Sequence, residues 1–160
     1  MIDRDLARRV SAEAVGTALL VAIVVGSGIA AQRLSPGDVG LQLLENSIAT
    51  GAGLVALILA IGPVSGAHFN PVVTLADRLL GGTSTRDAGA YMVAQVVGGC
   101  AGAVVANLMF SLSAVSFSTH TRSSGALWLG EVIATFGLLL VILGIVRAGR
   151  SSVAAYAVGG

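Results

Sequence analysis

The stretch Ser65-Gly-Ala-His-Phe-Asn-Pro-Val-Val-Thr-Leu-Ala-Asp-Arg-Leu-Leu-Gly-Gly82 begins like a tight loop and ends like a short helix. Pro63 is expected to end the helix before it, and Gly66 permits a sharp bend. Residues 65–69 are then expected to be extended. Their backbone carbonyls lack helical partners, so inside a membrane they must face either protein or water.

The second half of the stretch predicts a short helix over residues 70–80. Asn70 is a favourable N-cap, and Pro71 suits the first helical position. At about 1.5 Å per residue, such a helix crosses only half of a bilayer. Its N-terminus would lie near the midplane, where the Asn70 amide can donate hydrogen bonds to water or small uncharged solutes. The alternative is a surface loop and helix, in which Asp77 and Arg78 reach water.

The composition predicts an all-α membrane protein surrounded by lipid. Of the 160 residues, 55% are hydrophobic and 11% are charged, whereas soluble domains average about 25% charged residues. The net charge of +1 gives no reason to expect a nucleic-acid partner. Several apolar stretches reach the roughly 20 residues that a spanning helix needs. They cover residues 11–32, 43–62, 88–112 and 126–146, and a fifth stretch begins at 152 and runs to 160.

The arginines predict the orientation of these stretches. With the N-terminus in the cytoplasm, Arg33 and Arg122 lie outside and all other arginines lie inside, in agreement with the positive-inside rule. A cleaved signal peptide is the alternative for the first stretch. Its apolar run is long for that role, and Glu13 interrupts its start.

The chain contains an internal repeat. Glu13 and Glu131 are each followed by a threonine four residues later and then by a leucine-rich run. Three spans separate the two copies, so the second enters from the opposite face, as in the inverted repeats of transport proteins. We therefore expect a second Asn-Pro pair beyond Gly160 and interpret the chain as incomplete, with a natural four-span protein as the alternative. Both glutamates are expected near helix starts, where they accept hydrogen bonds from loop N–H groups or simply lie at headgroup level.

Other polar residues favour neither catalysis nor metal binding. Ser65 and His68 lack a third orienting group, so no enzyme activity is expected. His68 has no second metal ligand at a useful spacing, and no cofactor is expected. His120 is expected in a solvated loop. Small residues recur every four positions on the third span and predict close helix packing within the bundle. They are Ala94, Gly98, Gly102 and Ala106.

The opening stretch resembles the first signature box of the aquaporin family (major intrinsic proteins). Residues 65–76 carry the resemblance, together with 13–17, 91–98 and Glu131, which are similar to the family's first, third and fourth helices. The resemblance covers essentially the whole chain. It implies a helical bundle in which two re-entrant half-helices meet at the midplane, and a homotetramer with one pore per subunit at full length.

The resemblance also implies roles for single residues. Asn70 would be the midplane donor, and Pro71 would begin the half-helix. Gln95 would brace the loops together with Glu13 and Glu131. The remaining residues of the implied pore are Gly66, Ala67 and His68 in the carbonyl-bearing loop, and Leu20 and Leu138 in the apolar wall.

Two positions depart from the family pattern. Val72 replaces the usual alanine of the box, and Thr50 stands where a bulky aromatic of the outer filter usually lies. Without that ring, the filter is expected to be wider and more polar than a strict water filter, which favours glycerol or a neutral metalloid acid. The Asn-Pro-Val box resembles a bacterial subgroup linked with arsenic resistance. This implies arsenite as a cargo and a bacterial plasma membrane as the location.

The predicted function is a passive channel for water and small neutral solutes. A secondary transporter is the alternative, because such proteins also use inverted repeats and broken helices. The acids of this chain lie near helix ends and not at the midplane, which favours a channel. A further alternative is that the chain as it stands conducts nothing, because half a pore leaves the half-helix without a facing partner.

Overall fold

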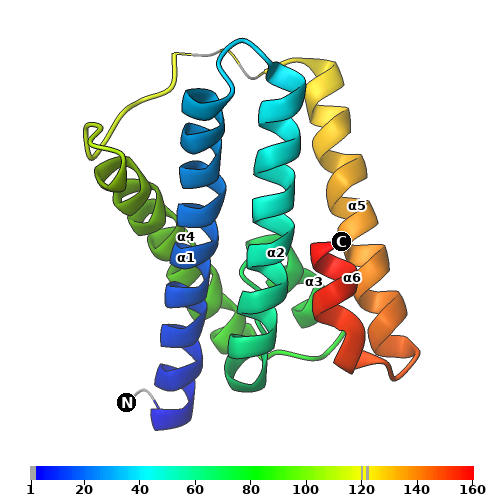
Figure 1. Ribbon diagram of the computed structural model, residues 1–160. Helices are drawn as coiled ribbons and strands as arrows, with labels where there is room; N and C mark the ends of the chain where they lie inside the picture. Colours follow the sequence, from blue (N-terminus) through cyan, green and yellow to red (C-terminus); the bar gives the residue numbers. More distant parts are fainter. Residues whose placement is uncertain (1–2, 120, 122) are drawn as a thin grey trace.

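The computed structural model describes residues 3–119, 121 and 123–160, and within these residues every regular element is a helix. The all-α prediction is therefore confirmed. His120 and Arg122 lie outside the described residues, so what the sequence predicts for them stays a prediction. The elements are α1 (Arg4–Leu34), α2 (Val39–Ser65), α3 (Pro71–Leu79), α4 (Thr85–Met109), α5 (Gly125–Arg147), the 3-10 turn η1 (Ser151–Val153) and α6 (Ala154–Gly159) (Figure 1).

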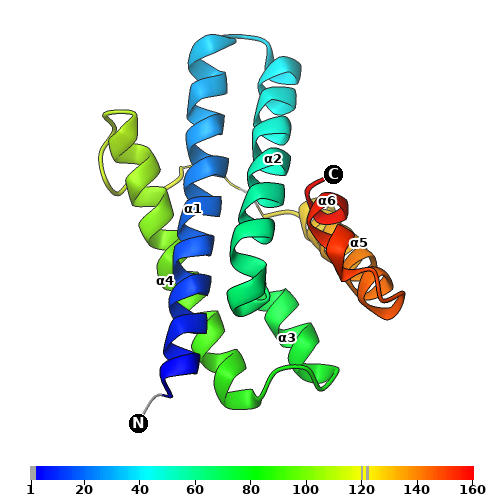
Figure 2. The ribbon, with the colours of Figure 1, turned by 60° about the horizontal axis from the view of Figure 1, so that its bottom comes forward.

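The long helices form a bundle in which α1 packs against both α2 and α4. The short helix α6 lies between α2 and α5 and contacts both of them. Figure 2 shows α3 below the end of α2, at the same end of the bundle as the N-terminus. There α3 contacts α4 and α5, so this short element connects the two sides of the bundle.

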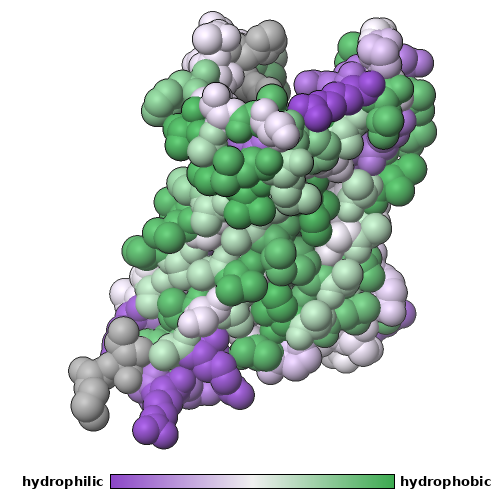
Figure 3. Space-filling view, turned by 60° about the vertical axis from the view of Figure 1, so that its left-hand side comes forward, coloured by the Kyte–Doolittle hydropathy of each residue, from purple (hydrophilic) through white to green (hydrophobic). Residues whose placement is uncertain are grey.

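The surface of the bundle is suited to lipid. Helices α1, α2, α4 and α5 are long and apolar enough to cross a membrane, by length and composition. Large apolar side chains such as Val96, Phe136 and Leu140 are more than half exposed. Figure 3 shows apolar surface between polar groups that gather toward the two ends. Since so much exposed apolar surface is unfavourable in water and favourable among lipid tails, the chain is an integral membrane protein.

Small residues bring α1 and α4 into backbone contact. A Cβ placed on Gly98 would lie 2.2 Å from the carbonyl oxygen of Ala14, and one on Gly102 would lie 2.1 Å from that of Ala18. Ala106, on the same stripe, is fully buried. The prediction that this stripe packs inside the bundle is confirmed, because the missing side chains allow the two backbones to approach closely.

The end of α2 and the loop after it differ from the sequence-based expectation. The helix passes through Pro63 and continues to Ser65. A proline inside a helix removes one N–H donor and crowds the carbonyl four residues earlier, which can kink a helix without ending it. Gly66 is the C-cap that follows, and it has a left-handed φ of 91°. The loop is not extended, since Ala67 and Phe69 also have positive φ values of 51° and 47°. These values are unusual outside glycine, so contacts from elsewhere in the fold must stabilise them.

Helix α3 begins at Pro71 with Asn70 as its N-cap. The Asn70 side-chain oxygen accepts a hydrogen bond from the Val72 N–H at 2.8 Å. The helix ends at Leu79, and Gly81, with a φ of 86°, turns the chain toward α4. The result is a helix of 9 residues, much shorter than its neighbours in the chain.

Candidate functional site

The loop between α2 and α3 is fixed to the carboxylate of Glu13. This side chain is fully buried and lies more than two turns inside α1, not near its start as the sequence suggested. Its Oε1 accepts hydrogen bonds from the Ser65 hydroxyl at 2.6 Å and the His68 N–H at 3.0 Å. Its Oε2 accepts one from the Phe69 N–H at 2.8 Å. A buried carboxylate is costly unless its oxygens are hydrogen-bonded, and these donors satisfy that need.

Gln95 connects this carboxylate to the short helix. Its Nε2 donates to Glu13 Oε2 at 2.8 Å and to the Thr74 hydroxyl oxygen at 2.9 Å. The same hydroxyl lies 3.1 Å from Nδ1 of His68. Gln95 and Thr74 are both buried. One hydrogen-bond network therefore joins α1, α3, α4 and the loop, and it holds α3 against the long helices.

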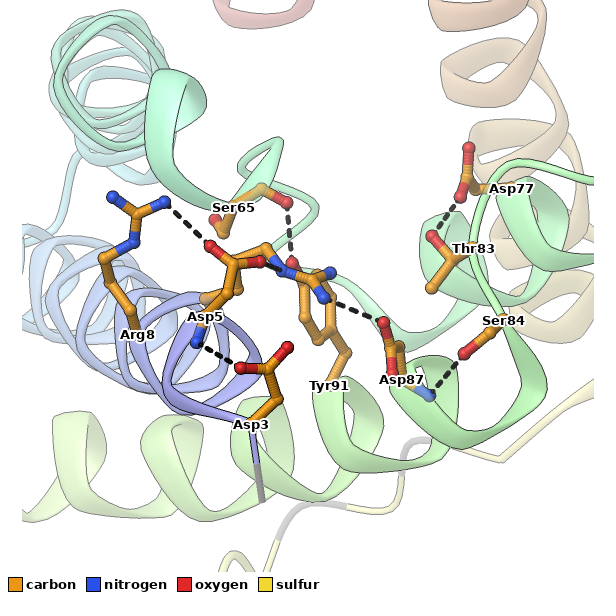
Figure 4. Close-up of polar contacts among 10 residues, drawn as sticks. Asp3, Asp5, Arg8, Ser65, Asp77, Thr83, Ser84, Asp87 and Tyr91 are labelled. Carbon is orange, nitrogen blue, oxygen red and sulfur yellow. Dashed lines mark hydrogen bonds and ion pairs between the residues drawn. The ribbon is translucent and has the colours of Figure 1, made fainter. Parts of the chain in front are cut away.

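Tyr91 of α4 holds the end of α2 at the start of the loop. Its hydroxyl donates to the Ser65 carbonyl oxygen at 2.9 Å, and Figure 4 shows it pointing at that residue. The ring meets the His68 ring edge-on, with centroids 5.5 Å apart. On its other side, the Arg9 guanidinium lies 6.0 Å from the ring centroid and pairs with Asp87 at 2.9 Å. An ion pair between α1 and α4 thus borders the tyrosine that supports the loop.

Phe69 is buried against a glycine of α1. A Cβ placed on Gly16 would lie 2.0 Å from Cε1 of the Phe69 ring, so only glycine leaves room for the ring there. Because the Phe69 N–H is bound to Glu13, both its backbone and its side chain are fixed to the same helix. These contacts account for the left-handed φ of Phe69.

A cavity of about 670 Å³ lies beside the loop and α3. His68 and Asn70 are among the polar residues that line it. The Asn70 oxygen is used by the helix cap, which leaves the Nδ2 amide as a donor. Asp77 lines the cavity further along α3. The apolar wall includes Leu20, Leu54, Ile58, Leu138, Ile142 and Val146.

The structure brings together some of the residues that the sequence predicted for a pore. Those that line the cavity are Gly66, Ala67, His68, Asn70, Leu20 and Leu138. Pro71, Val72 and Thr50 are not part of its lining. The Val72 side chain is 43% exposed, and the Thr50 hydroxyl is buried without a partner among the described residues. Glu131 is exposed in a shallow groove on α5.

Sequence reasoning missed several residues that hold the loop. Tyr91 lies four positions before Gln95 on the same face of α4, and this spacing was an available signal. Gly16 stands three residues after Glu13, on the face of α1 that the acid already marks as buried. The buried partner Thr74 carried no signal of its own in the sequence.

The fold and the site define a class of α-helical membrane protein. In this class a short capped helix and a hydrogen-bonded loop stand between long apolar helices and border a cavity. The family model described as major intrinsic protein matches residues 2–159. The chain belongs to the major intrinsic protein family, and the resemblance to aquaporins is confirmed.

Several relatives support this assignment. The chain is 50% identical over 153 residues to aquaglyceroporin AqpS of Rhizobium meliloti (strain 1021), a match that covers 96% of this chain and 65% of that protein. It is 36% identical over 135 residues to probable aquaporin NIP7-1 of Arabidopsis thaliana, with 84% of this chain and 48% of the relative covered. It is 33% identical over 150 residues to aquaporin-5 of Rattus norvegicus, with 91% and 55% covered. The chain therefore spans less than two thirds of the length of each of these relatives.

Proposed function

We propose that the protein carrying this chain is a passive membrane channel for water and small neutral solutes. The observation that carries the proposal is the Asn70 amide, whose Nδ2 has no acceptor among the described residues and which borders a cavity of about 670 Å³. It lies at the N-terminus of α3, where the partial positive charge of the helix opposes the passage of cations and protons. The apolar wall that faces it offers a passing solute few competing contacts. In this proposal α3 is a re-entrant half-helix. The solute passes without any chemical reaction, so the channel needs no enzyme activity.

Glycerol and arsenite-like neutral solutes are the cargo, in addition to water. Thr50 takes the place of the bulky aromatic residue of the outer filter, and Val72 takes the place of the usual alanine of the box. Both positions therefore differ from the pattern of a strict water channel. The name of the relative AqpS, an aquaglyceroporin, supports this choice. We also propose that Glu131, which is exposed on α5 in this structure, braces a second loop in the protein that carries this chain.

The working form is a homotetramer in a bacterial plasma membrane, with the N-terminus in the cytoplasm and residues 1–160 within a single membrane domain. The Rhizobium relative supports the bacterial setting. Arg8 and Arg9 lie near the start of α1, and Arg78 lies in the last turn of α3. Figure 2 shows α3 at the same end of the bundle as the N-terminus, which supports the orientation through the positive-inside rule. Reporter fusions at the N-terminus test the orientation, and cross-linking in native membranes tests the tetramer.

The central test removes the amide donor and keeps the helix cap. Asn70→Asp retains a side-chain oxygen for the Val72 N–H, since aspartate caps helices as well as asparagine does. The natural protein that carries these residues is placed in lipid vesicles, and the rates of swelling in water and glycerol gradients are measured by light scattering. We expect the variant to lose most of both fluxes.

Ser124→Asp is the matched control, because it introduces the same carboxylate at the N-cap of α5, away from the cavity lining. It should conduct normally. Normal flux through folded Asn70→Asp would refute the proposal. Flux that saturates at low solute or follows a proton gradient would favour a secondary transporter.

A further inference from the structure

Asp77 is placed on the same face of α3 as the Asn70 amide. Asn70, Val73 and Asp77 all line the cavity, and their spacing of three and four residues puts them on one side of the helix. Among the described residues that line the cavity, Asp77 is the one with a charged side chain. It lies about 10 Å beyond Asn70, at a rise of about 1.5 Å per residue.

The Asp77 carboxylate is held in a fixed position by the turn that follows α3. The Thr83 hydroxyl donates a hydrogen bond to Oδ2, as Figure 4 shows. A Cβ placed on Gly82 would lie 2.3 Å from Oδ1, so the carboxylate packs directly on the Gly82 backbone. Within the part of the chain that the structure describes, Oδ1 accepts no hydrogen bond. Since an ionised carboxylate has about four acceptor positions, those that Thr83 does not use and Gly82 does not cover remain available.

Few other polar groups surround this end of the cavity. Ser151 and Ser152 of η1 line the cavity, whereas the nearby α3 and α5 positions Ala76 and Val146 are apolar. A solute that leaves bulk water here loses hydrogen bonds to water, and the carboxylate can replace them with charge-assisted ones. An anion meets repulsion at the same place.

We propose that Asp77 is a specificity-determining residue, whose carboxylate accepts hydrogen bonds from the hydroxyl groups of a polyol or a neutral metalloid acid at one end of the pathway. This inference rests on the proposed channel function. The solute then meets an acceptor and a donor in succession, because Asp77 and Asn70 are too far apart to bind one glycerol together. Water permeability depends less on this carboxylate, since a water molecule finds hydrogen-bond partners along the whole path.

The test is Asp77→Asn in the natural protein that carries these residues, with glycerol and water permeabilities measured on the same lipid vesicles. The amide keeps the shape and an acceptor oxygen for Thr83, but it lacks the charge. Because hydrogen bonds to charged groups are stronger than neutral ones, we expect glycerol permeability to fall about fivefold and water permeability to fall less than about twofold. Asp77→Ser is measured alongside and should give the same change in the glycerol-to-water permeability ratio. It serves as the test if the amide variant does not fold.

Asp38→Asn is the matched control. It makes the same charge change at the N-cap of α2, outside the cavity lining, where asparagine caps equally well. Both of its permeabilities should match the wild type. An unchanged glycerol-to-water ratio in a folded Asp77 variant overturns the inference, as does an equal loss of both fluxes. Wild-type vesicles with neither water flux nor glycerol flux above that of empty vesicles would instead overturn the channel function itself.

Discussion

Replacing Gly16 by alanine should disturb the loop that carries the candidate site. The new Cβ would lie 2.0 Å from the Phe69 ring, and side-chain Cβ contacts are essentially never shorter than 3.0 Å. The ring or the helix must therefore move by at least about 1 Å. The ring has little freedom to do so, because Phe69 is 6% exposed and its N–H is bound to Glu13.

Two opposing terms set the size of the effect. Overpacking a well-packed core costs about 1–3 kcal/mol. Alanine returns about 1 kcal/mol in helix propensity relative to glycine. We expect a net loss of up to about 2 kcal/mol in the free energy of unfolding. The His68 and Phe69 amides should also exchange with deuterium faster, since their hydrogen bonds to Glu13 are displaced.

Thermal unfolding in detergent and hydrogen exchange of the peptide covering residues 65–72 measure the two effects. Gly89→Ala is the control, because its Cβ meets nothing within 4 Å on α4, and its stability should be unchanged or slightly higher. A Gly16→Ala protein that melts no lower than wild type, with unchanged exchange in the loop, would refute the steric reasoning.

Further variants test the helix crossing and the filter. Gly102→Ala should destabilise by about 2 kcal/mol after the gain in helix propensity, because its Cβ would meet the backbone oxygen of Ala18, which cannot rotate away. Gly137→Ala, with open space around its Cβ, is the control in the same melting assay, and equal midpoints for both would contradict this account. Thr50→Phe should reduce glycerol or arsenite flux through the natural protein more than water flux, as measured by vesicle swelling. Equal loss of all fluxes would count against a filter role.

Local sequence rules predicted the parts of the site that depend on local chemistry. Asn70 followed by proline indicated a helix start, because capping needs only a side-chain oxygen and a fixed φ close together in the chain. The stripe containing Gly98 and Gly102 indicated close packing, because small residues at helical spacing have few other uses in lipid. The acid at Glu13 pointed to buried donors, because an unpaired carboxylate in an apolar helix is costly.

The parts that sequence rules missed depend on contacts between distant residues. The left-handed φ of Ala67 goes against local preference, and it persists because the Ala67 N–H bonds to the Ser65 hydroxyl, which itself bonds to Glu13. Tyr91 and Ser65 are 26 positions apart, so no periodicity links them. Pro63 shows the reverse case. A local rule predicts a helix end there, but the helix continues to Ser65, because a proline can kink a helix without ending it.

The bond between Gln95 and Glu13 has a consequence for biosynthesis. It joins residues 82 positions apart, so the support for the loop is incomplete until α4 has been made and has docked on α1. Until then the left-handed residues of the loop lack the contacts that offset their strain, of order 1–3 kcal/mol each. We therefore expect α4 to dock on α1 before the loop and the short helix α3 take up their final positions.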